Sequence, residues 1–431
     1  MTDPNRALPV LGTLPSGWDI VSFESVLLGG TRNGIYKPKL HHGSGAKIVN
    51  MGELFAHRRL HAIAMKRLRV TQDELERFEL HQGDLLFARR SLVAEGAGKC
   101  TLVCEVDEPT VFESSIIRAR PDPEIADSAF LFYLFSSPYG SHAMGAITRQ
   151  VAVAGITGRD LAALSIPLPP LTVQRRIAGI LGAIDDKIEL NRRMNLTLES
   201  IACAVFKSWF IDFDPVRKKM EGGEVGLPSD LAAMFSQDMW ETALGPIPVG
   251  WDVERCSSQF SLTMGQSPPG ESYNEAGEGL PFYQGRRDFG SRYPTRRVYC
   301  DSPTRLAEPG DTLVSVRAPV GNINMATEPC CIGRGVAAVR HYSGAITYTF
   351  ETMNALGAQF ADFQTSGTVF GSVSGKDFAG LMVIAPPRPL VAAYEQEVRP
   401  IERLIKRQHE TCGSVIELRD ALLPRLMAGV I

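Results

Sequence analysis

The chain has 431 residues, 44% of them hydrophobic and 22% charged, which indicates a globular protein of about two to four domains rather than a disordered or collagen-like chain. No apolar run approaches the roughly 18 residues of a membrane-spanning helix, and residues 1–15 lack the layout of a secretion signal. The net charge of −3 argues against a general nucleic-acid coat protein, and eight cysteines without paired C-x-x-C spacing indicate reduced thiols in a cytoplasmic protein.

The first 169 residues alternate short β-rich runs with turns rich in glycine, proline, asparagine and aspartate. The runs Lys99–Val106 and Val111–Ala119 predict strands, and Ser128–Ser136 predicts a helix. Residues 1–169 therefore predict a mixed β domain with a few helices.

Basic residues gather in this first domain, and the stretch from Arg58 to Arg69 contains five of them and no acid. An arginine fork can grip phosphate, or the O6 and N7 atoms of guanine, with two hydrogen bonds. The alternative to nucleic-acid contact, for any single basic cluster, is an ordinary solvated surface. The candidate DNA-contacting residues of the first domain are Arg58, Arg59, Lys66, Arg67, Arg89, Arg90, Ser91, Arg149 and Gln150.

Residues 170–215 predict a long helix that begins near Thr172 and stops at Asp214-Pro215, because its apolar positions recur in alternating steps of four and three. Polar residues inside this heptad seam would fix register and partner choice at a cost in stability. A loose linker is expected over residues 216–247. The seam residues are Ile177, Leu181, Ile184, Ile188, Asn191, Asn195 and Leu198.

Residues 248–385 predict a second mixed β domain, with strands at Thr312–Val316 and Gly335–Val339. Ten of its eleven basic residues are arginines, several of them interleaved with aromatic residues, which suits groove contact or core packing. The candidate DNA-contacting residues of this second domain are Gln284, Arg286, Arg287, Arg292, Arg317, Asn322, Ser366 and Thr368.

Residues 386–431 predict a second long helix followed by a tail. Pro400 suits only a first turn or a kink, and Gly413 followed by the capping box Ser414 to Glu417 predicts a break. The alternative to a paired coiled coil is two ordinary amphipathic helices, each packed on its own domain. The second seam consists of Ile401, Ile405, Gln408, Val415 and Leu422.

Four landmarks recur in the same order in the two halves, which indicates a duplicated unit. They are a Pro-x-Gly-Trp-Asp turn, a Gly-Asp pair before a strand, a Thr/Ser-Gly-Arg/Lys-Asp element and a Pro-Pro pair. Their first residues are Pro15 and Pro248, Gly83 and Gly310, Thr157 and Ser374, and Pro169 and Pro386.

Sequence motifs of catalysis are missing from the chain. It has no phosphate-binding G-x-x-x-x-G-K-[ST] loop, no glycine-rich turn for a dinucleotide or methyl donor, and no Asn/Asp-Pro-Pro-aromatic motif of amino methylation. We therefore expect no catalytic residues and no metal site.

The sequence resembles the specificity (S) subunits of type I restriction–modification systems along nearly the whole chain. The most diagnostic stretches are Pro167 to Asp214, which includes Phe206-Lys207-Ser208-Trp209-Phe210, the Gly245 to Trp251 turn, and the tail from Leu418 to Met427. The second copy departs from the pattern, because Gln174-Arg175 has no counterpart after its Pro-Pro pair. This leaves the start of the second helix undefined.

The resemblance implies an α+β protein: two β-rich target-recognition domains, separated by two long antiparallel coiled-coil helices and related by an internal pseudo-twofold repeat. Each domain would read one half of a split double-stranded DNA target. The chain would be non-catalytic and bind no cofactor. It would dock methyltransferase (M) subunits, expected to be two, and through them restriction (R) subunits, with S-adenosylmethionine, ATP and Mg on those partners.

Two other classes of protein stay open at the level of sequence. One is a coiled-coil scaffold that binds only protein, against which the paired arginine loops argue. The other is an enzyme with its own nuclease or methyltransferase site, against which the missing nucleotide and methyl-donor motifs argue.

Overall fold

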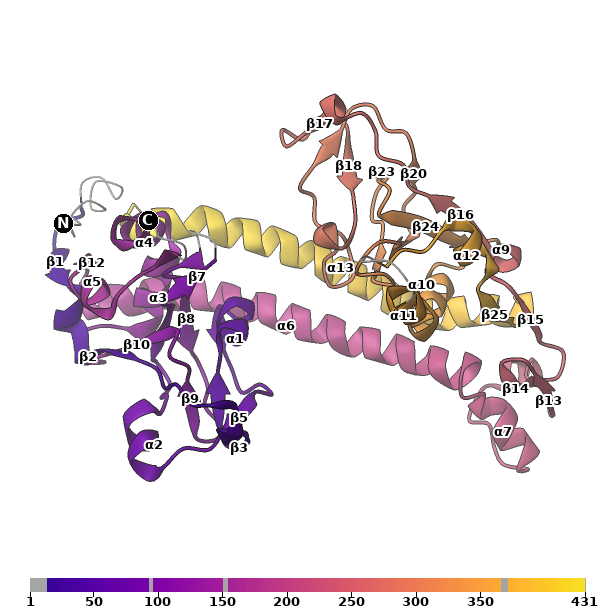
Figure 1. The fold of residues 1–431 in the computed structure, drawn as a ribbon, viewed down its shortest axis with the longest axis horizontal. Coiled ribbons are helices and arrows are strands. Elements are labelled where there is room, and N and C mark those ends of the chain that lie inside the picture. Colours follow the sequence, from indigo (N-terminus) through magenta and orange to yellow (C-terminus); the bar gives the residue numbers. More distant parts are fainter. Residues whose placement is uncertain (1–13, 93–95, 150–153, 366–370, 431) are drawn as a thin grey trace. The chain divides into compact units, whose positions relative to one another are not determined.

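The computed structural model describes residues 14–92, 96–149, 154–365 and 371–430. Two compact units make up the chain: unit 1 consists of Met1–Arg192 with Glu410–Ile431, and unit 2 of Arg193–His409. Their elements are labelled in Figure 1. Both units combine mixed sheets with helices, and each is described by itself below.

A five-stranded sheet with the order β2-β10-β6-β8-β4 forms the centre of unit 1. Its strand β6 is buried along its whole length, as expected for a run of four apolar residues inside a domain. Strand β8 lies within the first run predicted from the sequence, and β10 begins in the second run but extends beyond its end to Pro121. The bounds are Leu27–Asn33 (β2), Arg59–Leu60 (β4), Leu85–Ala88 (β6), Cys100–Val103 (β8) and Ile116–Pro121 (β10).

Smaller sheets and short helices surround this sheet in unit 1. One sheet has the order β5-β3-β9, and two ladders pair β1 with β12 and β7 with β11. The strands are Asp19–Ser22 (β1), His42–Val49 (β3), Lys66–Leu68 (β5), Arg90–Ser91 (β7), Thr110–Phe112 (β9), Ala154–Gly155 (β11) and Ser165–Leu168 (β12). The helices are Met51–Ala56 (α1), Gln72–Phe78 (α2), Pro138–Ile147 (α4) and Gly158–Ala162 (α5).

Helix α3 covers Ser128–Ser136, which confirms the helix predicted there. The Asp127 side chain caps it by accepting a hydrogen bond from the backbone N–H of Phe130 at 2.9 Å. Its residues Phe130 to Phe135 are all buried, and they share one core with Leu181 and Met427 from the two long helices described below. Burial on every side explains why this helix has no polar face.

Unit 2 contains two larger sheets, with the orders β16-β24-β21-β22 and β17-β19-β18-β23-β20. Strands β21 and β24 confirm the two runs predicted in this half. The first sheet consists of Phe260–Met264 (β16), Thr312–Ser315 (β21), Ile323–Met325 (β22) and Val336–His341 (β24). The second consists of Tyr273–Asn274 (β17), Leu280–Tyr283 (β18), Tyr299–Cys300 (β19), Leu306–Ala307 (β20) and Cys330–Ile332 (β23).

The remaining elements of unit 2 include a structured segment where the sequence predicts a loose linker. Phe213, with a φ of 55°, separates the preceding long helix from α7, and Pro215 lies in the first turn of α7. The segment contains Asp214–Met220 (α7), Ser229–Ala233 (α8) and the hairpin of Met239–Thr242 (β13) with Gly245–Pro248 (β14). The other elements are Asp252–Arg255 (β15), Cys256–Gln259 (α9), Ile346–Ala355 (α10), Gly357–Thr365 (α11), Gly375–Gly380 (α12) and Met382–Ala385 (β25).

The recurring Gly-Asp landmark has the same structural role in both units. Gly83 and Gly310 adopt φ values of 91° and 86°, which favour glycine, and the following aspartate begins or precedes a buried strand. Asp84 accepts hydrogen bonds from Arg120 at 2.7 and 2.8 Å, and Asp311 accepts one from Arg340 at 2.6 Å. The landmark therefore fixes a turn and a strand-to-strand ion pair.

The other landmarks also lead to matching structure. Strand β1 pairs antiparallel with β12, and β15 pairs antiparallel with β25, so that each unit joins the strand after its Pro-x-Gly-Trp-Asp turn to the strand before its Pro-Pro pair. Thr157 and Ser374 each cap a short helix by accepting a hydrogen bond from the backbone N–H three residues later. These pairs stabilise local structure in each unit.

Two long helices, α6 (Leu171–Phe210) and α13 (Arg388–Met427), each contain 40 residues and contribute to both units. In unit 1, the Cys412 thiol contacts the carbonyl of Ile188 at 3.6 Å. In unit 2, the Asn195 amide donates to the carbonyl of Ile405 at 3.4 Å. Every residue of the two predicted seams is buried or half-buried, and Asn191 is fully buried.

The predicted break in the second helix is absent. Helix α13 continues through Pro400 and Gly413, both of which are exposed, and a Cβ at Gly413 would meet nothing within 4 Å. A glycine costs about 1 kcal/mol in a helix interior, whereas burial of one large apolar side chain contributes about 1.5–3 kcal/mol. Packing of the buried side chains of α13, such as Ile405 and Leu423, therefore outweighs the local preference for a break.

Candidate nucleic-acid interface

A hollow in unit 2 brings together side chains that the sequence predicts as DNA contacts. Its volume is about 240 Å³, and three predicted residues, Gln284, Arg286 and Arg317, line it. A fourth lining residue, Arg334, was missed by the sequence analysis, because it stands alone between Gly333 and Gly335. The other lining residues are Ser267, Gly285, Ala318 and Gly335.

Three arginines and no acid line this hollow, which gives it a strongly positive local charge. Arg286, Arg317 and Arg334 are exposed, and so is Arg287 beside them. Such a hollow suits an anionic or acceptor-rich ligand, such as a phosphate or the edge of a base. Asn322 has a different role, because its side chain donates to the carbonyl of Pro319 at 3.2 Å within the turn after β21.

Arg292 corrects the prediction for this domain, because it is only 3% exposed and cannot reach DNA. Its guanidinium forms an ion pair with Glu402 of α13 and lies over the ring of Phe350, 4.2 Å from the ring centre. An isolated basic residue between aromatic neighbours has the same sequence pattern whether it faces solvent or the core. Arg292 is therefore a structural residue of unit 2.

Acidic side chains lie close enough to Arg292 to interact with its charge. Burial raises the pKa of Glu351 on α10 to about 7, although the positive charge of Arg292 opposes this rise. Burial also raises the pKa of Glu199 on α6, and the charge of Glu402 adds to both increases. At neutral pH Glu351 is therefore only partly ionised.

Replacing Glu351 by glutamine should remove part of the pH dependence of stability. The carboxyl pKa is about 7 in the folded chain against an ordinary 4.5, so folding takes up a proton between these values and stability falls as the pH rises through them. Relative to the wild type, Glu351→Gln should gain up to about 3 kcal/mol in free energy of unfolding between pH 4.5 and about pH 8. Urea unfolding at several pH values measures this gain, with Glu397→Gln on an exposed position of α13 as control, and a difference independent of pH would contradict the expectation.

In unit 1, the arginine loop after β6 has the same backbone surroundings as the loop after β21 in unit 2. Gly155 pairs with Arg90, and Ser372 forms a bridge with Arg317. Arg90 is exposed on β7 with Ser91 next to it, whereas Arg89 is half-buried and donates to the carbonyl of Ser114 at 3.3 Å. Arg90 is thus the positional counterpart of Arg317.

The other basic candidates of unit 1 are dispersed rather than gathered. Arg59 forms an ion pair with Asp186 of α6 at 2.7 Å, Arg67 pairs with Glu108 at 2.7 Å, and Arg149 pairs with Asp160 at 2.8 Å. These partners argue against their use as DNA contacts. Lys66 is exposed on β5. Gln150, Ser366 and Thr368 lie outside the described residues.

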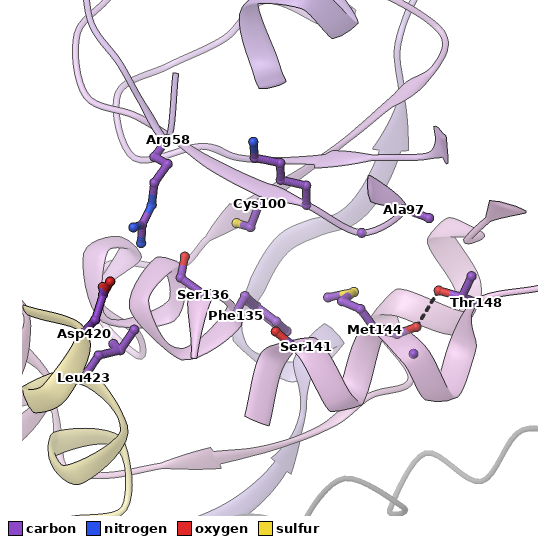
Figure 2. Close-up of a pocket in the computed structure, with 13 residues that line it drawn as sticks. Arg58, Ala97, Cys100, Phe135, Ser136, Ser141, Met144, Thr148, Asp420 and Leu423 are labelled. Atoms are coloured by element: carbon purple, nitrogen blue, oxygen red, sulfur yellow. Dashed lines mark hydrogen bonds between the residues drawn. The ribbon is translucent and has the colours of Figure 1, made fainter. Parts of the chain in front are cut away.

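Arg58 lines a second, larger cavity of about 800 Å³ in unit 1. Figure 2 shows its side chain directed toward Asp420 of α13. Burial lowers the pKa of Arg58, and the nearby charge of Arg419 adds to this effect. Lys99 also lines the cavity, but Asp420 offsets part of the positive charge, so this cavity is a weaker anion site than the hollow of unit 2.

The described part of the chain contains no group of three or more His, Cys, Asp or Glu side chains placed to bind a metal ion. None of its helices combines the length and the apolar character needed to cross a membrane.

Comparison with known proteins finds similarity to specificity subunits of type I restriction systems. The family model described as the type I restriction modification DNA specificity domain matches residues 15–200. The putative type I restriction enzyme MjaX specificity subunit of Methanocaldococcus jannaschii is 26% identical over 427 residues, which cover 98% of this chain and 95% of that protein. The type I restriction enzyme HindI specificity subunit of Haemophilus influenzae is 25% identical and covers 82% of this chain and 87% of its own.

A solved structure has a similar fold. The S subunit of a type I restriction–modification system from M. genitalium superposes with a TM-score of 0.54 and covers 96% of each chain. Its sequence is only 16% identical, so the likeness concerns the fold alone.

Proposed function

We propose that this chain is a specificity subunit of a type I restriction–modification system and that it reads a split double-stranded DNA sequence with two recognition domains, residues 1–169 and 248–385. The observation that carries the proposal is the hollow lined by Arg286, Arg317 and Arg334, with Arg90 at the position in unit 1 that corresponds to Arg317. Exposed arginines at corresponding loops suit two readers of one duplex.

The two recognition domains are, in this proposal, copies of one ancestral unit related by a pseudo-twofold repeat. The matching ladders β1–β12 and β15–β25 and the matching ion pairs of Asp84 and Asp311 support it. The spacer segments 170–215 and 386–431 would then pair as an antiparallel coiled coil, with residues 216–247 as the connection between the two copies. The contacts of Ile188 with Cys412 and of Asn195 with Ile405 fit this pairing.

In this proposal the chain is the non-catalytic subunit of its complex, which fits the matches to a DNA specificity domain and to a specificity subunit. We expect two methyltransferase subunits to bind it and restriction subunits to join through them. In this arrangement S-adenosylmethionine, ATP and Mg belong to the partners, and the complex works in the cytoplasm.

Replacing Arg317 by alanine should weaken or relax recognition of one half-site only. A base contact through an arginine fork contributes about 1–3 kcal/mol of discrimination, and Arg317 belongs to one domain. Competition binding with duplexes altered in either half-site measures the effect, and Arg305→Ala, an exposed arginine of unit 2 away from the hollow, is the control. An equal loss on all DNA with a shallower salt dependence would assign Arg317 to phosphate, and unchanged binding would contradict its place at the interface.

A further inference from the structure

The hollow of unit 2 is a rigid site rather than a chance gathering of mobile side chains. Four segments line it, and backbone hydrogen bonds tie together those of Gln284, Arg317 and Arg334. The N–H of Val316 donates to the carbonyl of Gly335 at 2.9 Å, and the N–H of Gly333 donates to the carbonyl of Tyr283 at 2.9 Å. The arginines of the hollow therefore project from backbone positions that are fixed relative to one another.

Contacts with residues nearby in the sequence also hold the segment around Gln284 in place. Its N–H donates to the buried carboxylate of Asp288 at 2.7 Å, and Arg297 pairs with the same carboxylate at 2.8 Å. A Cβ at Gly335 would lie 2.1 Å from the Gln284 carbonyl oxygen, so only glycine allows this approach. The glycine beside Arg334 is therefore required for the hollow to form.

Arg334 differs from the other arginines of the hollow because its side chain is oriented by the protein. Ser267 Oγ accepts hydrogen bonds from the backbone N and from Nε of Arg334, each at 3.4 Å. Within the described residues, the two terminal nitrogens of Arg334 have no hydrogen-bond or ion-pair partner. Its fork is thus partly preorganised and its two outer donors remain available, which lowers the entropy cost of a two-bond contact.

We propose that Arg334 reads a guanine in the half-site of unit 2, with its fork on the O6 and N7 atoms of that base. This inference rests on the proposed function and names the base that this part of the hollow takes. Guanine is favoured because it is the base whose major-groove edge offers two acceptors to an arginine fork. No acidic side chain lines the hollow, so none of the lining residues competes with a DNA base for the fork. Residues 248–385 as a whole contain 13 acidic and 11 basic residues.

The test uses the full chain assembled with its methyltransferase partner, on duplexes whose sequence is first established by mapping methylated sites with the wild-type chain. Single guanines are then replaced by 7-deazaguanine, which keeps the base pair but lacks N7. Wild-type affinity should fall by about tenfold at one position of one half-site, which corresponds to a contact of about 1.4 kcal/mol. Arg334→Ala removes every side-chain donor to N7, so it should become insensitive to the replacement at that position.

Arg305→Ala is the control and should retain the full sensitivity of the wild type. The inference is overturned if Arg334→Ala stays as sensitive to 7-deazaguanine as the wild type, or if neither half-site contains a guanine that responds to this replacement. Failure of the proposed function is a separate outcome, because it would show already in the wild-type map as the absence of a split methylated sequence.

Discussion

Replacing Arg292 by alanine should lower the stability of unit 2 by about 3–5 kcal/mol, although its sequence surroundings predict a DNA contact. The guanidinium is 3% exposed and pairs with Glu402, and the hydroxyl of Tyr293 donates to the same carboxylate at 3.3 Å. Without Arg292, the half-buried carboxylate of Glu402 and the buried carboxyl group of Glu351 would lose their nearby positive charge. Urea unfolding followed by tryptophan fluorescence is a suitable measurement, since Trp209 and Trp251 are buried in the core of unit 2.

Arg296→Ala is the matched control for Arg292→Ala. Arg296 pairs with Glu328 at 2.5 Å, but its side chain is 59% exposed, and exposed pairs contribute about 0–1 kcal/mol. A small loss of stability for Arg292→Ala, together with a clear loss of DNA affinity in a folded chain, would contradict the structural role assigned to Arg292.

Inserting one heptad near Asn195 and a matched heptad near Gln408 should lengthen the unread gap between the two half-sites. Both α6 and α13 are continuous 40-residue helices, and the two insertion points face each other, since Gln408 contacts the sulfur of Met194 at 3.3 Å. Seven helical residues span about 10 Å, which corresponds to about three base pairs of duplex. Sequencing of methylated sites measures the gap directly.

A heptad placed in α6 alone is the control for the paired insertion. It should displace contacts such as the one between Asn195 and Ile405 and impair assembly, because the partner helix lacks the matching residues. A correctly assembled complex with an unchanged gap after the paired insertion would refute the idea that helix length sets the gap.

The helices and the recurring landmarks could be predicted because their signals are local or periodic. Helix α3 has a capping aspartate followed by a run of apolar residues, and the seam of α6 repeats at heptad spacing over seven positions. The continuity of α13 through Gly413 could not be predicted in this way. Local preference favours a break there, and only the packing of side chains from distant parts of the chain overrides it.

The candidate site was predicted in part, for a related physical reason. The sequence identified Gln284 and Arg286 at a basic cluster, and Arg317 by its place after the strand that follows the second Gly-Asp pair. The fold brings these three residues to one hollow. The sequence could not separate them from Arg292, whose partner Glu402 is 110 residues away in the chain. It also missed Arg334, because a single arginine between two glycines gives no cluster signal. A contact that depends on a distant segment leaves no local pattern.

The most direct test of the whole account is a map of N6-methyladenine across the genome of cells that express this chain together with its methyltransferase partner, against cells with the partner alone. The account predicts a split methylated sequence that appears only when this chain is present. A soluble and demonstrably assembled complex that produces no such sequence, and whose chain binds no duplex in a random DNA pool, would contradict the assignment of this chain as the sequence-reading subunit.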